Sequence, residues 1–441
     1  MSNDNMVNSF RSYSHKLDPS LRENLLFSYQ PLNRTPRFLR VFYERFISKT
    51  KKLSVIVEFD KEQCTKGLLE VEEIIQHHKN CKMNHHFTRI SCCSANITPA
   101  ALQDMLSRCS SIKKVHLNRE IKALLNTAIP AAKAKSVKRD NTVLTGKGIT
   151  TAIIDTGVYP HEDLTGRIID FADFINERTE PYDDNGHGTH CAGAVAGNGL
   201  ASNEKYKGPA PESNIIGVKV LDKMGAGSLE TVMLGVEWCI EYNEKHPNNK
   251  IDIINLSLGS LAQRFDNEEE DPLVRIVNEA WDQGIVVCAA AGNDGPKEKT
   301  ISSPGVSEKV ITVGALDDKD TASRKDNEVA DFSSRGPTPY GKAKPDILAP
   351  GVDIISLRSP LSYIDRLQKH DRVENDYFTM SGTSMATPIC AGVVALLLQH
   401  NPELTPQQVK KMILEGADMW SDKDPNVYGS GYINAENSIS Q

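Results

Sequence analysis

The sequence has 441 residues, enough for one large domain and a smaller one, and 39% hydrophobic with 25% charged residues is typical of a soluble globular protein. The formal net charge of −7 argues against a protein built to bind nucleic acid. The first residues lack the basic and apolar regions of a secretory signal, and no apolar run approaches the length that spans a bilayer. The nine cysteines are scattered without paired metal-ligand spacing, so we expect reduced thiols in a cytoplasmic protein with no membrane span.

Residues 1–52 form a basic N-terminal extension. They hold ten Lys or Arg and four Asp or Glu, which gives this stretch a local charge of +6. Phe38, Phe42 and Phe46 recur at helical spacing among the basic residues. Such a helix could dock on an anionic surface. More often its apolar face packs on its own protein, and we favour that interpretation.

Residues 53–125 are predicted to form a small α+β unit. Segments with strand-like alternation are separated by segments with helical spacing. Their order resembles a split βαβ arrangement. Residues 126–147 are polar and poor in pattern, which predicts a linker. The expected strands cover 53–59, 87–95 and 112–117, and the expected helices cover 67–78 and 99–106.

Residues 148–441 are predicted to form a larger α/β domain. Continuous apolar runs alternate with helix-like segments, which is typical of a mostly parallel sheet with helices on both faces. Chemistry in such sheets gathers at the carboxyl ends of strands, where Asp155, Ser257 and Asn293 fall. We expect strands over 149–154, 214–221, 251–259, 285–291 and 310–314, helices over 228–246, 272–283 and 405–417, and a charged, irregular surface loop over 359–376.

Ser384 stands where a helix is expected to begin. Gly382 allows a turn before it, and an apolar run starts at Cys390. Unpaired N–H groups and the positive end of the helix dipole gather at such a point. A hydroxyl there could attack a carbonyl while nearby donors hold the oxyanion. The alternative is that Gly-Thr-Ser only caps the helix.

Asp155 and His187 supply the two other groups that a serine nucleophile needs. A base must remove the hydroxyl proton, and a carboxylate must hold the tautomer of that base. Asp155 ends a buried strand, where a carboxylate is costly without a partner, and His187 lies between two glycines. As alternatives, Asp155 could be a turn carboxylate, and His187 with His190 could bind metal, although no third ligand is in view.

Asn293 adds a side-chain amide that could donate to an oxyanion. Alone, before Asp-Gly, it could be only a turn residue. Taken together, the four residues in this chain order and on this fold pattern favour a catalytic site over four separate structural roles.

The sequence resembles the subtilisin-like serine proteases. The matching blocks are Asp155-Thr156-Gly157, His187-Gly188-Thr189-His190-Cys191-Ala192-Gly193 and Gly382-Thr383-Ser384-Met385-Ala386, in the family order Asp, His, Ser. The resemblance runs from about residue 145 to residue 435. It implies that Asp155 orients His187, that His187 acts as base and then acid, that Ser384 is the nucleophile, and that Asn293 and the Ser384 N–H form the oxyanion hole. His190 matches a structural position of the family.

The same resemblance implies a cleft that holds substrate as an extended strand. Gly225-Ala226-Gly227 and Ser257-Leu258-Gly259 match the two edges that pair with substrate backbone. Ala289-Ala290-Ala291-Gly292 would line the S1 pocket. Because these segments carry no charge, we expect apolar or aromatic side chains at P1.

The N-terminal part is similar in pattern to the family's pro-domain, a chaperone and inhibitor of the protease. We expect it to act as an intramolecular inhibitor, with residues 120–127 in the cleft and Leu124 or Leu125 in S1. The alternative is an ordinary accessory domain.

The chemistry requires no cofactor. The segment 197–207 does not match the loop that binds a strong calcium ion in many relatives, so calcium there is doubtful. A structural calcium ion elsewhere stays possible, and we assign no metal ligands. The longer 359–376 segment and the lack of a signal fit the intracellular bacterial high-alkaline type.

We therefore expect a serine endopeptidase that hydrolyses protein substrates through an acyl-enzyme. The alternative is a catalytically silent module with the same fold that binds extended peptides. The presence of Asp155, His187, Ser384 and Asn293 argues for the enzyme.

Overall fold

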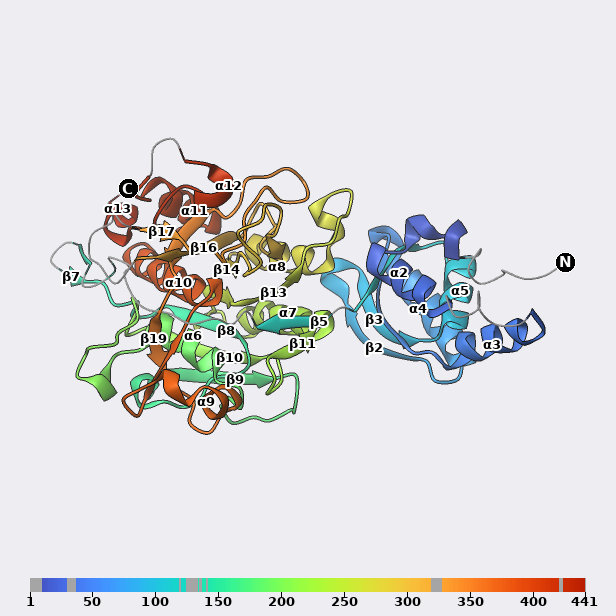
Figure 1. Cartoon of the computed structure of the whole chain (residues 1–441), viewed down its shortest axis with the longest axis horizontal. Helices are drawn as coiled ribbons and strands as arrows, with labels where there is room; N and C mark the ends of the chain where they lie inside the picture. The colour runs from blue at the N-terminus through green and yellow to red at the C-terminus, as the bar shows by residue number, and fades with distance from the viewer. Residues whose placement is uncertain are drawn as a thin grey trace. The chain divides into compact units, whose positions relative to one another are not determined.

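The structure is a computed structural model that describes residues 10–29, 37–118, 120–123, 134, 137–139, 142–318, 327–419 and 423–440. It divides into two compact units, residues 1–119 with 263–265 and residues 120–262 with 266–441 (Figure 1). The division falls at residue 119 because residues 120–123 pair with strands of the second unit.

The first unit holds an antiparallel sheet with two helices. In chain order its elements are β1 (Leu53–Phe59), α4 (Cys64–His77), β2 (Lys82–Phe87), β3 (Cys92–Ile97), α5 (Pro99–Arg108) and β4 (Ile112–Leu117). The strand order is β2-β3-β1-β4, the expected split βαβ arrangement. The single strand predicted over 87–95 is wrong: β2 and β3 are a pair separated by a turn in which Ser91 adopts φ of +53°. In the sequence, the apolar residues before and after that turn look like one continuous strand.

The basic extension adds helices α2 (Pro19–Tyr29) and α3 (Arg37–Thr50) to the first unit. Leu21 and Leu25 of α2 are buried in the same core as the sheet. Asp18 fastens this segment, since its carboxylate accepts from Leu21 N and Leu117 N, both at 2.6 Å.

The expectation that the apolar face of residues 38–47 packs on the protein is wrong for two of its aromatic side chains. Phe42 is 74% exposed and Phe46 is 57% exposed in α3. Their neighbour Ile47 does pack against the core. Helix α3 packs against helices α5 and α2, and Ile47 lies on the side of α3 that reaches the core.

The second unit is built on an eight-stranded sheet. In chain order the strands are β8 (Thr150–Asp155), β9 (Ile168–Asp173), β10 (Asn214–Lys219), β12 (Ile253–Leu256), β14 (Val286–Ala290), β16 (Ile311–Asp317), β17 (Glu328–Val329) and β18 (Ile347–Pro350). The sheet order is β17-β16-β14-β12-β8-β10-β9, with β18 also paired to β16. Only the β16–β17 pairing among these is antiparallel. The predicted mostly parallel sheet is confirmed.

Helices cover both faces of this sheet (Figure 1). The pair α6 (His187–Ala196) and α10 (Thr383–His400) pack on one another, as do α7 (Leu229–Lys245) and α8 (Pro272–Asp282). Contrary to the expectation that no apolar run approaches the length that spans a bilayer, helix α10 is long and apolar enough to cross one. Because 89% of it is buried inside the protein, it has the character of a core helix. The chain closes with α11 (Pro406–Glu415), α12 (Pro425–Tyr428) and α13 (Ala435–Ile439).

Three smaller sheets are present among the described residues of this unit. One contains β5 (Glu120–Ala123), β11 (Ala226–Ser228), β13 (Leu258–Leu261) and β15 (Ser302–Ser303), in the order β11-β5-β13-β15. The others are β19 (Ile354–Leu357), β21 (Tyr377–Met380) and β20 (Arg372–Val373), and the pair β6 (Lys138–Arg139) and β7 (Thr142–Val143). The strand predicted over 251–259 is therefore two strands, β12 and β13, in different sheets.

The segment 359–376 is not the irregular surface loop that its charges predicted. It contains the short helix α9 (Tyr363–Leu367) and strand β20. Asp365 is buried and binds two arginines, Arg358 and Arg372, at 2.5 and 2.6 Å. These charges lie seven residues apart in the sequence, so their pairing was not visible there.

Candidate active site

The carboxyl end of β8 and the start of α6 bring Asp155 and His187 together. His187 Nδ1 lies 2.7 Å from Asp155 Oδ1, and both side chains are fully buried. Burial acts to lower the pKa of His187, but the Asp155 carboxylate outweighs burial and holds that pKa well above its ordinary value of 6.5. The bond places a proton on Nδ1 and leaves Nε2 as the acceptor of the neutral ring.

Asp183 stabilises the turn that precedes His187. Its Oδ1 accepts from Asn185 N at 3.0 Å and Gly186 N at 2.8 Å, and its Oδ2 accepts from Thr189 N at 2.9 Å. The Asp183 carboxylate therefore caps the first turn of α6.

Gly188 lets α6 approach β8 closely. A Cβ at this position would lie 2.2 Å from Gly157 O and 3.1 Å from Asp155 Cβ, which leaves no room for any other residue. The His-Gly sequence is thus a packing requirement of the Asp155–His187 contact.

Ser384 lies in the first turn of α10 and forms two hydrogen bonds with Ser257. Ser384 Oγ donates to Ser257 O at 3.1 Å, and Ser257 Oγ donates to Ser384 O at 2.8 Å. Asn255 Nδ2 in turn donates to Ser257 Oγ at 2.9 Å. The sequence placed Ser257 at a strand end where chemistry gathers and on a substrate edge, but its hydrogen bonds to Ser384 were not predicted.

His187 and Ser384 are brought near one another by the packing of α6 on α10. Cys191, one turn after His187, has its Sγ 3.5 Å from Ser384 O and 3.9 Å from His187 Nδ1. Within the described part of the chain, His187 Nε2 is buried and has no hydrogen-bond partner. In the neutral ring this atom can accept a proton, while Ser384 Oγ donates to Ser257 O, and catalytic hydrogen bonds often form or tighten only when substrate binds.

Asn293 follows β14 and is fastened by its carbonyl oxygen. Its Oδ1 accepts from Thr383 N and Thr383 Oγ1, each at 3.0 Å. Its Nδ2 is buried and has no partner among the residues that the structure describes. A fixed amide donor without a partner, next to the start of the Ser384 helix, can stabilise an oxyanion.

The alternative in which His187 and His190 bind metal together does not fit the geometry. His190 Nε2 lies 3.0 Å from Ile354 O and 3.1 Å from Phe378 O, so it donates to backbone and is not a ligand. Burial and the nearby His187 lower the pKa of His190 to about 3, which keeps this ring neutral.

Asp155, His187 and Cys191 have ligand atoms within 4.8 Å of one another. Asp155 Oδ1 and His187 Nδ1 lie 2.7 Å apart as hydrogen-bond partners, whereas two ligands about 2 Å from a tetrahedral ion would lie about 3.3 Å apart. We assign no metal site there.

The two predicted substrate edges hold a strand of this chain. β5 is antiparallel to β11, with Gly227 opposite Ile121, and antiparallel to β13, with Gly259 opposite Lys122 and Leu258 opposite Ala123. Residues 124–127, including the two leucines predicted for S1, lie outside the described residues.

Residues predicted to line S1 lie beside these edges. Ala290 ends β14 and is fully buried. Gly292 has φ of +111°, and a Cβ there would lie 2.3 Å from Ser302 Oγ. Gly225, with φ of +77°, makes the turn into β11.

The chain is similar to known proteins over nearly its whole length. Residues 146–431 match the Subtilase family. The chain is 61% identical over 434 residues to serine protease AprX of Bacillus subtilis (strain 168), an alignment that covers 98% of both chains. It is 32% identical over 351 residues to the thermostable alkaline protease of Halalkalibacterium halodurans, covering 80% of this chain and 84% of that protein.

A solved structure shows the same fold. The crystal structure of fervidolysin from Fervidobacterium pennivorans matches with a TM-score of 0.67 at 21% sequence identity. The match covers 89% of this chain and 61% of fervidolysin, so the present chain spans about three-fifths of that protein's length.

Proposed function

Since this chain belongs to the subtilase family and is a serine endopeptidase, we propose that Ser384, His187 and Asp155 form its catalytic triad. The observation that carries the proposal is the buried 2.7 Å bond between His187 and Asp155, which leaves a buried Nε2 without a partner in the described chain. That arrangement prepares the imidazole to accept a proton from a serine hydroxyl.

In the proposed reaction, Ser384 Oγ leaves its bond to Ser257 O, passes its proton to His187 Nε2 and attacks the scissile carbonyl. Asn293 Nδ2 and the Ser384 N–H hold the oxyanion. His187 then protonates the leaving amine, and a water molecule, activated in the same way, releases the acyl group.

Active-site labelling tests the triad. A fluorophosphonate should label wild-type protein on Ser384, and Ser384→Ala should be neither labelled nor active. His187→Ala should lose almost all activity, and the Ser384→Ala, His187→Ala double variant should lose little more, because the groups work as a unit. Folded wild type that takes up no label would favour the silent peptide-binding module instead.

The N-terminal part is proposed to inhibit the enzyme by occupying its cleft. The support is β5, which lies between β11 and β13 with antiparallel pairing to both, as an extended substrate would. A tethered segment competes at high effective concentration. Substrates are proposed to be proteins cleaved after apolar or aromatic residues, and a peptide library dominated by Arg or Lys at P1 would contradict this. A cytoplasmic location stays a prediction.

The loop over 197–207 is proposed to be held by the protein itself and not by calcium. The buried carboxylate of Asp163 accepts from Gly199 N, Ala201 N and Tyr377 Oη, each at 2.9 Å. A carboxylate with three such donors has the satisfied hydrogen bonds that a buried charge requires.

A further inference from the structure

Lys219 ends β10 directly beside Asp155. In the parallel pairing of β10 with β8, these two residues are register partners. The Lys219 side chain is fully buried. Burying an ammonium group is costly unless its charge and its three donors are satisfied, so the partners of Lys219 show what the residue holds.

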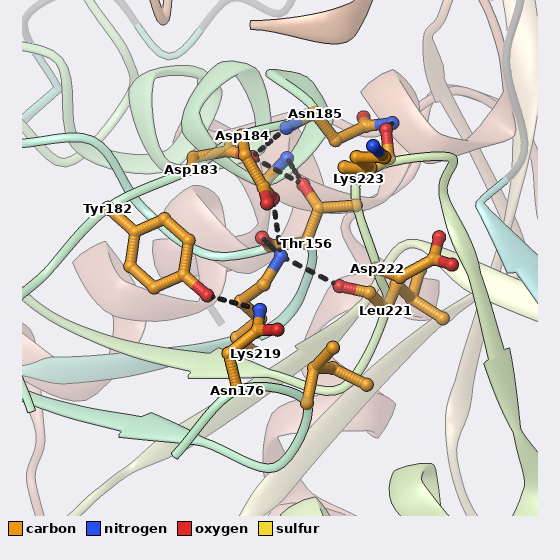
Figure 2. Close-up of polar contacts among 12 residues, drawn as sticks. Thr156, Asn176, Tyr182, Asp183, Asp184, Asn185, Lys219, Leu221, Asp222 and Lys223 are labelled. Carbon is orange, nitrogen blue, oxygen red and sulfur yellow. Dashed lines mark hydrogen bonds and ion pairs between the residues drawn. The ribbon is translucent and has the colours of Figure 1, made fainter. Parts of the chain in front are cut away.

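All three acceptors of Lys219 come from different segments. Lys219 Nζ donates to Thr156 O at 2.6 Å, to Asp184 Oδ1 at 2.8 Å and to Leu221 O at 2.9 Å (Figure 2). Thr156 immediately follows Asp155. Asp184 belongs to the turn before His187, and Leu221 begins the loop that leads to β11.

A second bond ties the same turn to the same loop. Asn185 Nδ2 donates to Lys223 O at 3.0 Å (Figure 2). Asn185 Oδ1 accepts from His187 N at 3.1 Å. The loop before β11 is therefore joined to the residues next to Asp155 and His187 by a few hydrogen bonds, and Lys219 makes three of them.

We propose that Lys219 is a positioning residue that holds the β11 edge at a set place relative to Asp155 and His187. The proposal rests on the proposed function, since it concerns how substrate reaches the triad. An extended peptide pairs with β11 at some distance from its scissile bond, as residues 120–122 do in β5. A shift of β11 therefore displaces the scissile carbonyl from Ser384, and a misplacement of about 1 Å can cost about 100-fold in rate.

This role predicts a dependence on substrate length. A peptide long enough to pair with β11 needs that edge in register, whereas a single-residue ester does not reach it. A residue that merely stabilises the fold would lower the rate with both substrates by the same factor.

The test compares kcat and KM of the full chain on a tetrapeptide amide and on an acetyl amino-acid ester with the same P1 residue. In Lys219→Met, which removes the ammonium, we expect kcat/KM for the tetrapeptide to fall about tenfold more than for the ester. Fluorophosphonate labelling of Ser384 should persist. Asp184→Ala should also lower kcat/KM more for the tetrapeptide than for the ester, by a smaller factor. Asp184→Asn, which keeps the Oδ1 acceptor, should retain most of the wild-type kcat/KM for the tetrapeptide.

Lys344 provides a matched control. It is also buried, and its Nζ donates to Val310 O at 3.2 Å, to Thr312 Oγ1 at 2.8 Å and to Asp346. These partners serve strands β16 and β18, not the turn before His187. Lys344→Met should lower the Tm while changing both substrates by an equal factor.

Equal losses on the two substrates in Lys219→Met would overturn the proposal, as would the same length dependence in Lys344→Met. If Lys219→Met does not fold, Asp184→Ala decides, because the Asp184 side chain is 37% exposed and its loss is tolerable. The proposed function fails separately, when Ser384→Ala keeps activity or the label sits on another residue.

Discussion

Ser257 and Ser384 exchange two hydrogen bonds: each side-chain hydroxyl donates to the backbone carbonyl of the other residue, at 2.8 Å from Ser257 and 3.1 Å from Ser384. Ser257 stands between β12 of the main sheet and β13 of the substrate edge. The proposed nucleophile is thus fastened to the edge that would hold its substrate.

Ser257→Ala should weaken this link without removing it, because the backbone carbonyl of residue 257 remains. The lost bond to Ser384 O is worth about 1 kcal/mol, which should lower the Tm by a few degrees and kcat by several-fold. Thermal unfolding and steady-state kinetics measure both effects. Thr405→Ala, at the cap of α11 in the same unit, is a control that should lower the Tm alone.

Asn293→Ala should lower kcat by about two to three orders of magnitude with little change in KM, the usual size for loss of one oxyanion donor. Thr383→Val removes only one of the two donors that fasten Asn293 Oδ1 and should cause a smaller loss. Kinetics on one peptide substrate compares the two variants. A kcat within about threefold of wild type in Asn293→Ala would remove this residue from the oxyanion hole.

Activity should increase toward alkaline pH. Only the neutral imidazole accepts the serine proton, and burial, which lowers the pKa of His187, is outweighed by Asp155, so that pKa lies well above 6.5. kcat/KM should rise as pH rises through it. Asp155→Asn removes the opposing charge, so the rising limb should move to lower pH while the plateau falls by up to about 10⁴-fold. If the rising part of the pH profile does not move in Asp155→Asn, Asp155 is not the group that raises the pKa of His187.

The raised pKa of His187 also affects stability. Its folded-state pKa exceeds the unfolded value of about 6.5, so the ion pair stabilises the fold fully below that pH. The contribution is lost as pH rises through the folded pKa.

The N-terminal part should be cut from the catalytic part by the enzyme itself. The described part of β5 ends at Ala123, which lies opposite Leu258, and the next residue of that edge is Ser257, whose carbonyl accepts from Ser384 Oγ. We predict cleavage within a few residues of Leu125 in wild type and none in Ser384→Ala, as read by intact mass.

Two further results bear on inhibition by this segment. Added fragment 1–125 should inhibit the separated catalytic part. Lys122→Pro removes a backbone donor from β5 and should weaken inhibition. Fully active wild type that stays uncut, together with a fragment that does not inhibit, would leave residues 53–125 as an accessory domain.

Chelation should leave the loop over 197–207 intact. With Asp163 bonded to three protein donors, EGTA should change the Tm of Ser384→Ala protein by less than about 2 °C, whereas Asp163→Asn should lower it by several degrees, since bonds to a charged group are worth about 1.5–3 kcal/mol each. Ser384→Ala is the background because it prevents self-digestion. A large fall with EGTA that added calcium reverses would show a calcium site.

The sequence alone determined the features that depend on neighbouring residues. Continuous apolar runs predicted the parallel sheet, since strands buried on both faces must be apolar throughout. The short motifs around Asp155, His187 and Ser384 predicted the site, because glycines, a strand end and a helix start each impose local requirements that stay visible in the order of residues. The resemblance to a pro-domain predicted that residues 120–127 lie in the cleft, and the described residues 120–123 pair with both expected substrate edges.

Tertiary structure alone decided which polar groups meet. Lys219 ends a run of apolar residues, and its three acceptors come from 63 residues before it, 35 residues before it and 2 residues after it. Asp163 and Tyr377 are hydrogen-bonded although they are 214 residues apart. Asp365 binds one arginine that precedes its helix in the sequence and one that follows it. A buried charge must find partners, but which partners it finds depends on the path of the backbone, and hydrogen bonds act over about 3 Å whatever the separation in sequence.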